Sequence, residues 1–272
     1  MHPYISIGPL RLPSFALMAG LGIAAFFLWT LMILYRKERR PLQENLKILA
    51  VCALSLGALF FFALLFNSLF HSIERGYLVL GGITWEGGVI GGFAAFLLFT
   101  RLLVKGERGH EVRLFSTLIP GLVLAHAFGR VGCFLGGCCF GRLTESPLGV
   151  CFPDGSAAAE LYPNTLTGVG SFPVLPTQLF EAAFELMLFL LMVLLYKRLS
   201  SYNLALYLTA YGIFRFVLEF YRGDSRGATG IALSPSQLMS LILLAAGVCI
   251  LLYQKGLWPR RPATPPTSDE RT

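Results

Sequence analysis

The sequence is poor in charge, since Asp, Glu, Lys and Arg make up only 14% of its 272 residues. A soluble domain carries about 25% charged residues, because its surface faces water. Histidine is also scarce, with four residues. No histidine or carboxylate stands at metal-ligand spacing from the cysteines, so no metal site is predicted. These shortages exclude an ordinary soluble enzyme, and no segment is long enough to form a separate soluble domain.

Apolar residues are abundant instead and make up 55% of the chain. They gather into runs long enough to span about 30 Å of hydrocarbon as a helix. The alternating pattern of a membrane barrel is absent, and a backbone in lipid must satisfy its own hydrogen bonds. The predicted fold class is therefore all-α, a polytopic membrane bundle of about seven transmembrane helices. The predicted spans are residues 14–35, 47–70, 87–104, 114–135, 177–196, 204–221 and 234–253.

The basic residues are distributed unevenly between the two sets of loops. Of the 22 Lys and Arg residues, fifteen fall in one set, and the opposite set holds only Arg11, Arg75, Arg142, Arg222 and Arg226. The more basic loops are expected in the cytoplasm, which places the N-terminus outside and the C-terminus inside. The net charge of +7 is then a topology signal whose partner is anionic lipid, and no nucleic-acid partner is expected. The predicted location is a bacterial cytoplasmic (inner) membrane.

The domain organisation follows from the same runs. Residues 1–257 are predicted to form a single transmembrane domain, in which the Gly- and Pro-rich segment 136–175 makes a small outer cap. Residues 258–272 are polar and proline-rich and are predicted to be a disordered cytoplasmic tail. The first apolar run is interpreted as a span and not as a cleaved signal, because its basic cluster follows it.

Four of the six cysteines gather where the fourth span reaches the outside. That compartment permits a disulfide, so a disulfide or plain packing is favoured over a metal site. The four are Cys133, Cys138, Cys139 and Cys151.

Two arginines lie inside predicted spans, where a permanent charge is costly and needs an anionic partner. Arg215 has Glu219 one turn later on the same helical face. This pair is either a structural ion pair or a phosphate-binding arginine held in place by a carboxylate. Tyr211 adds a hydroxyl to that face, and Arg222 extends the polar strip outwards.

Arg130 is the second arginine and has His126 one turn before it. Arg130 either extends to the outer headgroups or binds an anion. His126 is either a core residue or a general base, since the unperturbed pKa of histidine lies near neutrality. Further polar groups begin other spans at the same end: Glu86 with Gly87 and Gly88, and Gln178 with Glu181. Glu86 also fits a plain helix cap.

These motifs, in this order, resemble the bacterial prolipoprotein diacylglyceryl transferases over nearly the whole chain. The matching segments are Ile7-Gly8-Pro9, residues 86–91, residues 129–134, Pro176-Thr177-Gln178-Leu179-Phe180-Glu181 and the late motif from Tyr211 to Arg222. The resemblance implies transfer of the diacylglyceryl group of phosphatidylglycerol to the lipobox cysteine of preprolipoproteins, with a thioether product. It implies no cofactor. It also implies that Arg130 and Arg215 bind the phosphate, that Tyr211 and Glu219 support Arg215, and that the other matched polar residues line the substrate site.

The sequence departs from the family pattern at several positions. The histidine before the double glycine is Glu86, and the signature asparagines and glutamate are Cys133, Gly136 and Cys138. Three hypotheses follow. Glu86 or His126 serves as the base, or the acceptor differs from a lipobox cysteine, or the protein is a non-catalytic relative that binds anionic lipid.

Overall fold

The computed structural model describes residues 4–7, 10–77, 84–224 and 233–256. Each of the seven predicted apolar runs corresponds to one helix. These are α1 (Ser14–Arg36), α2 (Leu42–Arg75), α3 (Trp85–Leu103), α4 (Glu111–Gly136), α6 (Thr177–Leu194), α8 (Asn203–Glu219) and α9 (Pro235–Gln254). The connections carry the short helices η1 (Lys105–Glu107), α5 (Ala157–Leu161) and α7 (Tyr196–Leu199).

Length and composition make this a polytopic helical membrane protein. Within the described ranges, five helices are long and apolar enough to cross a membrane: α1, α2, α4, α6 and α9. The apolar part of α3 is shorter, and α8 has 17 residues. Large apolar side chains on these helices point outwards, and Leu194 is 81% exposed. In water such surfaces would aggregate, whereas lipid solvates them.

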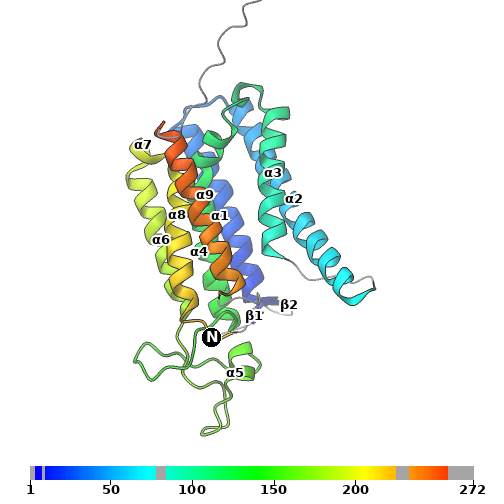
Figure 1. The fold of residues 1–272 in the computed structure, drawn as a ribbon, viewed down its shortest axis with the longest axis vertical. Helices are drawn as coiled ribbons and strands as arrows, with labels where there is room; N and C mark the ends of the chain where they lie inside the picture. Colours follow the sequence, from blue (N-terminus) through cyan, green and yellow to red (C-terminus); the bar gives the residue numbers. More distant parts are fainter. Residues whose placement is uncertain (1–3, 8–9, 78–83, 225–232, 257–272) are drawn as a thin grey trace, which may run out of the picture.

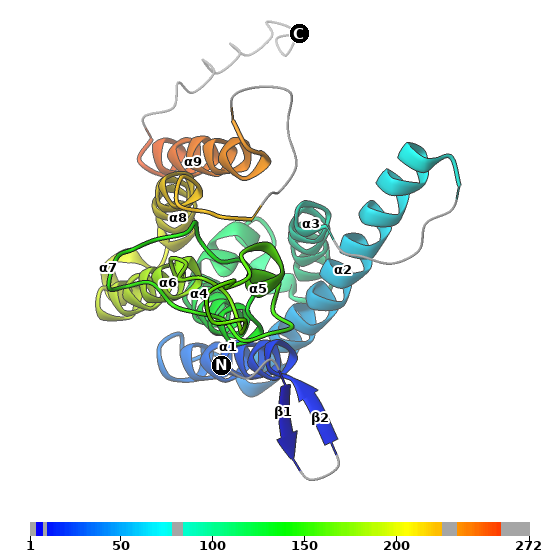
Figure 2. The same cartoon turned by 90° about the horizontal axis from the view of Figure 1, so that it is seen from below.

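Helix α4 lies at the centre of the bundle, where it packs against α1, α6 and α8 (Figure 2). Helix α9 packs against α8, and α3 packs against α2. The C-terminal end of α2 extends away from the other helices (Figure 1). The central position of α4 matters for function, since α4 carries two of the predicted site residues.

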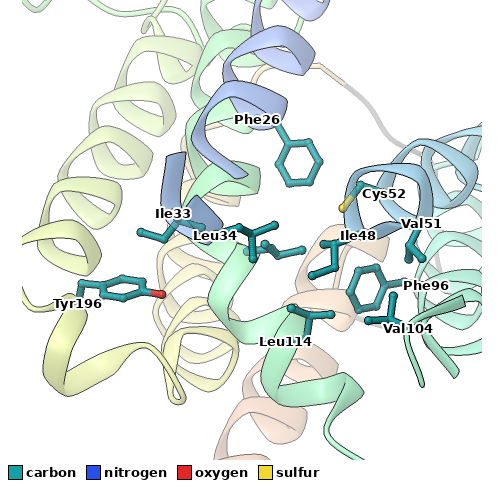
Figure 3. Close-up of a cluster of buried hydrophobic side chains, with 11 residues drawn as sticks. Phe26, Ile33, Leu34, Ile48, Val51, Cys52, Phe96, Val104, Leu114 and Tyr196 are labelled. Carbon is teal, nitrogen blue, oxygen red and sulfur yellow. The ribbon is translucent and has the colours of Figure 1, made fainter. Parts of the chain in front are cut away.

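Two apolar clusters hold the bundle together. The first joins α1, α2, α3 and α4 towards the end that lies away from α5, and Figure 3 shows Phe26, Leu34, Ile48, Phe96 and Leu114 within it. The second joins α4, α6 and α8 through Val123, Met192 and Leu204. Both clusters contact α4, which is therefore packed on two sides, and the second cluster fixes its position relative to α6 and α8.

The all-α prediction is wrong for the N-terminal arm. Strands β1 (Tyr4–Ile7) and β2 (Leu10–Pro13) form an antiparallel pair in which Ile7 lies opposite Leu10. Each strand has only four residues, which is at the lower limit at which an alternating pattern identifies a strand. The arm therefore gave no clear strand signal beside the long apolar runs.

The chain between α4 and α6 forms a small lobe at the end of the bundle (Figure 1). Phe140, Phe152, Ala158 and Val174 form its apolar core. A β-bridge between Gly141 and Arg222 ties the lobe to the end of α8. The lobe therefore sits directly over the ends of α4, α6 and α8, where the predicted site residues lie. The predicted tail, residues 258–272, lies outside the described residues.

Candidate active site

Arg130 is held by two partners on the inner side of α4. Its Nε lies 3.1 Å from Oε1 of Glu181 on α6 and donates a hydrogen bond of 3.1 Å to Nε2 of His126. The side chain of Glu181 is completely buried, and that of Arg130 is 18% exposed. A buried carboxylate next to a guanidinium offsets the cost of removing both charges from water. The pair therefore anchors Arg130 within the bundle.

His126 has its second nitrogen turned towards α6 and α8. Its Nδ1 lies 2.9 Å from Oε1 of Glu185 and 3.2 Å from the hydroxyl of Tyr207. An arginine N–H can only donate, so Nε2 of His126 accepts from Arg130 and the proton of the neutral ring is on Nδ1. This arrangement fixes both the tautomer and the orientation of the imidazole.

Tyr211 completes the link between α6 and α8. Its hydroxyl donates a hydrogen bond of 2.8 Å to Oε1 of Glu181. Its ring meets the edge of the His126 ring and stacks on that of Tyr207. One carboxylate oxygen of Glu181 thus contacts residues from both α4 and α8, which makes Glu181 the centre of the polar network.

Arg215 forms the second buried pair, with Glu219 one turn later on α8. Nη2 of Arg215 lies 2.6 Å from Oε2 of Glu219, and the two side chains are 7% and 8% exposed. Ser234, which caps α9, donates a hydrogen bond of 2.9 Å to the other oxygen of Glu219. The pairing expected from the i,i+4 spacing is therefore present, and it is supported by α9.

The two arginines belong to one electrostatic network, which contains a buried hydrogen-bond donor without a partner among the described residues. Glu181 interacts electrostatically with both Arg130 and Arg215. Nη1 of Arg215 is buried and has no hydrogen-bond partner among the described residues. Arg130 contacts Glu181 and His126 through Nε. Buried donors without a partner are costly, and a bound anion would satisfy them.

Gln178 and Arg222 lie one layer further out and hold the start of the lobe. Nε2 of Gln178 donates to the carbonyl oxygen of Cys138 at 2.7 Å, and Nη1 of Arg222 donates to that of Cys139 at 2.7 Å. Burial disfavours the charged form of Arg222, but its ion pair with Asp224 outweighs this, and the pKa of Arg222 is raised. Both residues therefore fix backbone above the arginines.

Gly87 and Gly88 lie where α3 packs closely against α2. A Cβ on Gly87 would lie 2.6 Å from Cβ of Phe66, and one on Gly88 would lie 3.1 Å from the carbonyl oxygen of Leu59. The structure thus gives them a packing function, and substrate contact stays a prediction. Glu86 begins the same helix, but its side chain lies outside the described part of the molecule, so its predicted role as a base stays a prediction as well.

Three cysteines gather beside Arg130. The sulfur atoms of Cys133, Cys138 and Cys139 lie within 4.8 Å of one another. All six cysteines of the chain lie in the described ranges, and none of them forms a disulfide there. Their spacing is close enough for the three sulfurs to hold one metal ion. Among the described residues, no other group of three or more His, Cys, Asp or Glu side chains is spaced in this way.

Two members of the network were missed from the sequence. Glu185 lies one turn after Glu181, inside a predicted span, and a carboxylate at that depth is itself a signal of a functional or paired group. Tyr207 lies one turn before Tyr211 on the same face of α8. Both could have been found by following the polar face of each helix one turn further into the membrane.

Comparison with known proteins identifies relatives that match nearly the whole chain. Residues 3–253 match the family model of prolipoprotein diacylglyceryl transferase. The chain is 33% identical over 258 residues to phosphatidylglycerol–prolipoprotein diacylglyceryl transferase 2 of Clostridium perfringens. The aligned region covers 90% of this chain and 91% of the relative. It is 28% identical over 257 residues to the corresponding protein of Dehalococcoides mccartyi, with 92% of each chain covered. The chain therefore belongs to the prolipoprotein diacylglyceryl transferase family.

Proposed function

We propose that this protein transfers the diacylglyceryl group of phosphatidylglycerol to the lipobox cysteine of preprolipoproteins. One observation carries the assignment of the site. Two arginines from different helices, Arg130 and Arg215, are each anchored by a carboxylate, and Nη1 of Arg215 is buried without a hydrogen-bond partner among the described residues. A phosphodiester offers two anionic oxygens to such donors.

The reaction itself needs stabilisation of a developing charge. The sulfur of the acceptor thiolate forms a bond with the glycerol carbon, and the bond between that carbon and the phosphate oxygen breaks. The electron pair of the broken bond stays on the leaving glycerol phosphate. Fixed donors around that phosphate stabilise the added charge as it develops, and this is the role we assign to Arg130 and Arg215.

The carboxylates have a separate role, which is to hold the guanidinium groups in place. Glu181 and Glu219 balance the arginine charges before the lipid binds, so the network tolerates its position in the bundle. The incoming phosphate then contacts the terminal nitrogens, while Nε of Arg130 stays on Glu181 and Nη2 of Arg215 stays on Glu219. Donors that need no reorganisation contribute most to the rate.

The number of spans and the sides of the membrane on which the two termini lie are also part of the proposed function. We infer seven spans, with the N-terminus outside and the C-terminus in the cytoplasm of a bacterial inner membrane. The loop opposite the lobe carries three basic residues, Lys105, Arg108 and Arg113. The lobe itself, residues 137–176, has a single basic residue, Arg142. That bias supports placing the lobe and the arginines at the outer leaflet. We further propose one transmembrane domain over residues 1–257, followed by a disordered cytoplasmic tail.

The test uses purified full-length protein, phosphatidylglycerol labelled in its acyl chains and a lipobox peptide. We expect a thioether-linked product and release of glycerol phosphate. Arg215→Ala and Arg130→Ala should each lower kcat/KM by about 10²- to 10³-fold, the usual loss when one charge-stabilising donor is removed. Arg142→Ala is the matched control, because Arg142 is an exposed arginine of the lobe and should leave the activity unchanged.

The same assay separates the two alternatives. Release of glycerol phosphate without modification of the peptide would indicate a different acceptor. Binding of the lipid without any turnover would indicate a non-catalytic relative. Near-normal turnover by both arginine variants would contradict the assignment of the phosphate site.

A further inference from the structure

The three thiols beside Arg130 come from two short stretches of chain. Cys133 lies in the last turn of α4, and Cys138 and Cys139 follow its C-terminal cap, Gly137. The Cys133 thiol interacts with both of the others. Cys133 is buried, while Cys138 and Cys139 are partly exposed. The cluster therefore has one buried cysteine and two that are partly accessible.

The backbone that carries these thiols is held rigidly. Cys139 has a φ of +63°, a left-handed conformation that costs a non-glycine residue about 1 kcal/mol or more. Its carbonyl oxygen accepts hydrogen bonds from Thr177 at 3.0 Å and from Arg222 at 2.7 Å. Gln178 holds the carbonyl oxygen of Cys138. Three side chains thus maintain the strained turn that brings adjacent cysteines together with Cys133.

The spacing suits a thiophilic cation. Tetrahedral Zn²⁺ with Zn–S bonds of about 2.3 Å places its sulfur ligands about 3.8 Å apart, and these three sulfurs already lie within 4.8 Å of one another. Arg130 interacts electrostatically with Cys133 and Cys139, and Arg222 interacts with Cys139. These positive charges offset part of the negative charge that the sulfurs acquire when a metal ion displaces their protons.

We propose that Cys133, Cys138 and Cys139 bind one Zn²⁺ and that its open fourth position takes the thiolate of the acceptor cysteine. Sites with three protein ligands and one exchangeable position are typical of catalytic zinc. The second half of the proposal rests on the proposed function. Coordination releases the thiol proton to solvent. The zinc-bound sulfur then attacks the glycerol carbon, and the electron pair of the broken C–O bond leaves with the phosphate held by Arg130.

This arrangement accounts for a feature of the sequence that the transfer reaction alone leaves unexplained. Cys133 and Cys138 are two of the departures from the family pattern, and Glu86 is a third. A metal-bound thiolate needs no general base at the moment of attack, because its proton is lost on coordination. The cysteine cluster would therefore take over the activation of the acceptor.

The first experiment measures metal binding without reference to activity. The full-length protein in detergent is reduced, stripped with a chelator and reloaded with Zn²⁺ or Co²⁺. We expect one metal ion per chain and, with Co²⁺, the intense absorption of thiolate-to-metal charge transfer. Cys138→Ser and Cys139→Ser should weaken metal affinity by at least tenfold, whereas Cys151→Ser, an exposed cysteine of the same lobe, should not change it.

Several results would overturn the site. These are less than one metal ion per chain, an undiminished affinity in both serine variants, or a disulfide between any two of the three cysteines in protein isolated without reductant. Correct folding of the variants is checked by their thermal unfolding and by retained binding of phosphatidylglycerol, so that loss of metal cannot be attributed to misfolding.

The second experiment tests the open position. A lipobox peptide should alter the Co²⁺ spectrum, and the same peptide with serine in place of its cysteine should not. An unchanged spectrum would overturn the coordination of the acceptor while leaving the metal site in place. Transfer activity in protein without metal would overturn the role of zinc in the reaction and leave the proposed function standing. Metal binding without any transfer would instead support the metal site and contradict the proposed function.

Discussion

Nε2 of His126 accepts a hydrogen bond of 3.1 Å from Nε of Arg130, which lies one turn later on α4. The other ring nitrogen faces Glu185 at 2.9 Å. The imidazole is thus a spacer between a carboxylate of α6 and a guanidinium of α4. Its acceptor nitrogen is occupied, so it is poorly placed to remove a proton from a substrate. We infer that His126 is a positioning residue for Arg130.

The first prediction concerns this role of His126. His126→Ala should lower kcat by about 10- to 100-fold, because misorientation of a positioned group by about 1 Å has an effect of this size. His126→Asn should restore part of the loss, since its amide can donate to Glu185 and accept from Arg130. The pH profile of kcat/KM should keep its shape in the asparagine variant. A profile that loses its acidic limb would instead identify His126 as the base, because a general base acts only when it is deprotonated.

The second prediction concerns Glu181, the centre of the network. Glu181→Gln leaves Arg130 without its buried counter-charge and should lower the free energy of unfolding by about 3 kcal/mol or more. Tyr211→Phe removes one hydrogen bond to that carboxylate and should cost only about 1 kcal/mol. Denaturant unfolding in detergent measures both changes. Glu160→Gln is the matched control, since Glu160 is exposed on α5; an equal effect there would contradict the assignment.

Local patterns of the sequence predicted the parts of the site that lie within one helix. The apolar runs located the seven long helices of the described part of the chain, and the spacing of Arg215 and Glu219 predicted their ion pair. The partner of Arg130 could not be predicted in this way, because Glu181 lies on another helix. Only the packing of α4 against α6 brings the two together.

The cysteine cluster shows a second limit of sequence reasoning. Adjacent cysteines such as Cys138 and Cys139 are poor ligands for one metal ion in ordinary backbone conformations. The left-handed φ of Cys139 changes the direction of its side chain, and that conformation depends on hydrogen bonds from α6 and from the end of α8. Propensity alone does not predict it, since non-glycine residues rarely adopt it.

The third prediction separates the two candidate routes to an acceptor thiolate. If Glu86 is the base, Glu86→Gln should lower kcat by about 10²-fold or more, the usual contribution of general base catalysis. If zinc activates the acceptor thiol, Glu86→Gln should keep most of its activity, and the activity should then depend on added Zn²⁺. We expect the second result. Measuring kcat of Glu86→Gln with and without chelator decides between them.

The fourth prediction tests the packing that positions α4. Gly22 of α1 faces α4, and a Cβ at this position would lie 2.9 Å from the carbonyl oxygen of Ala125. Backbone cannot move as a side-chain tip can, so Gly22→Ala must push the two helices apart, at a cost of about 1–3 kcal/mol.

Gly20 provides the matched control for this prediction, because a Cβ there meets no described atom within 4 Å. Gly20→Ala should therefore leave the thermal unfolding temperature unchanged or raise it slightly, since alanine favours the helix by about 1 kcal/mol. Because Arg130 lies on the displaced helix, Gly22→Ala should also lower transfer activity, with an increase in KM for phosphatidylglycerol. Equal unfolding temperatures and equal KM values for the two variants would contradict the close contact between α1 and α4.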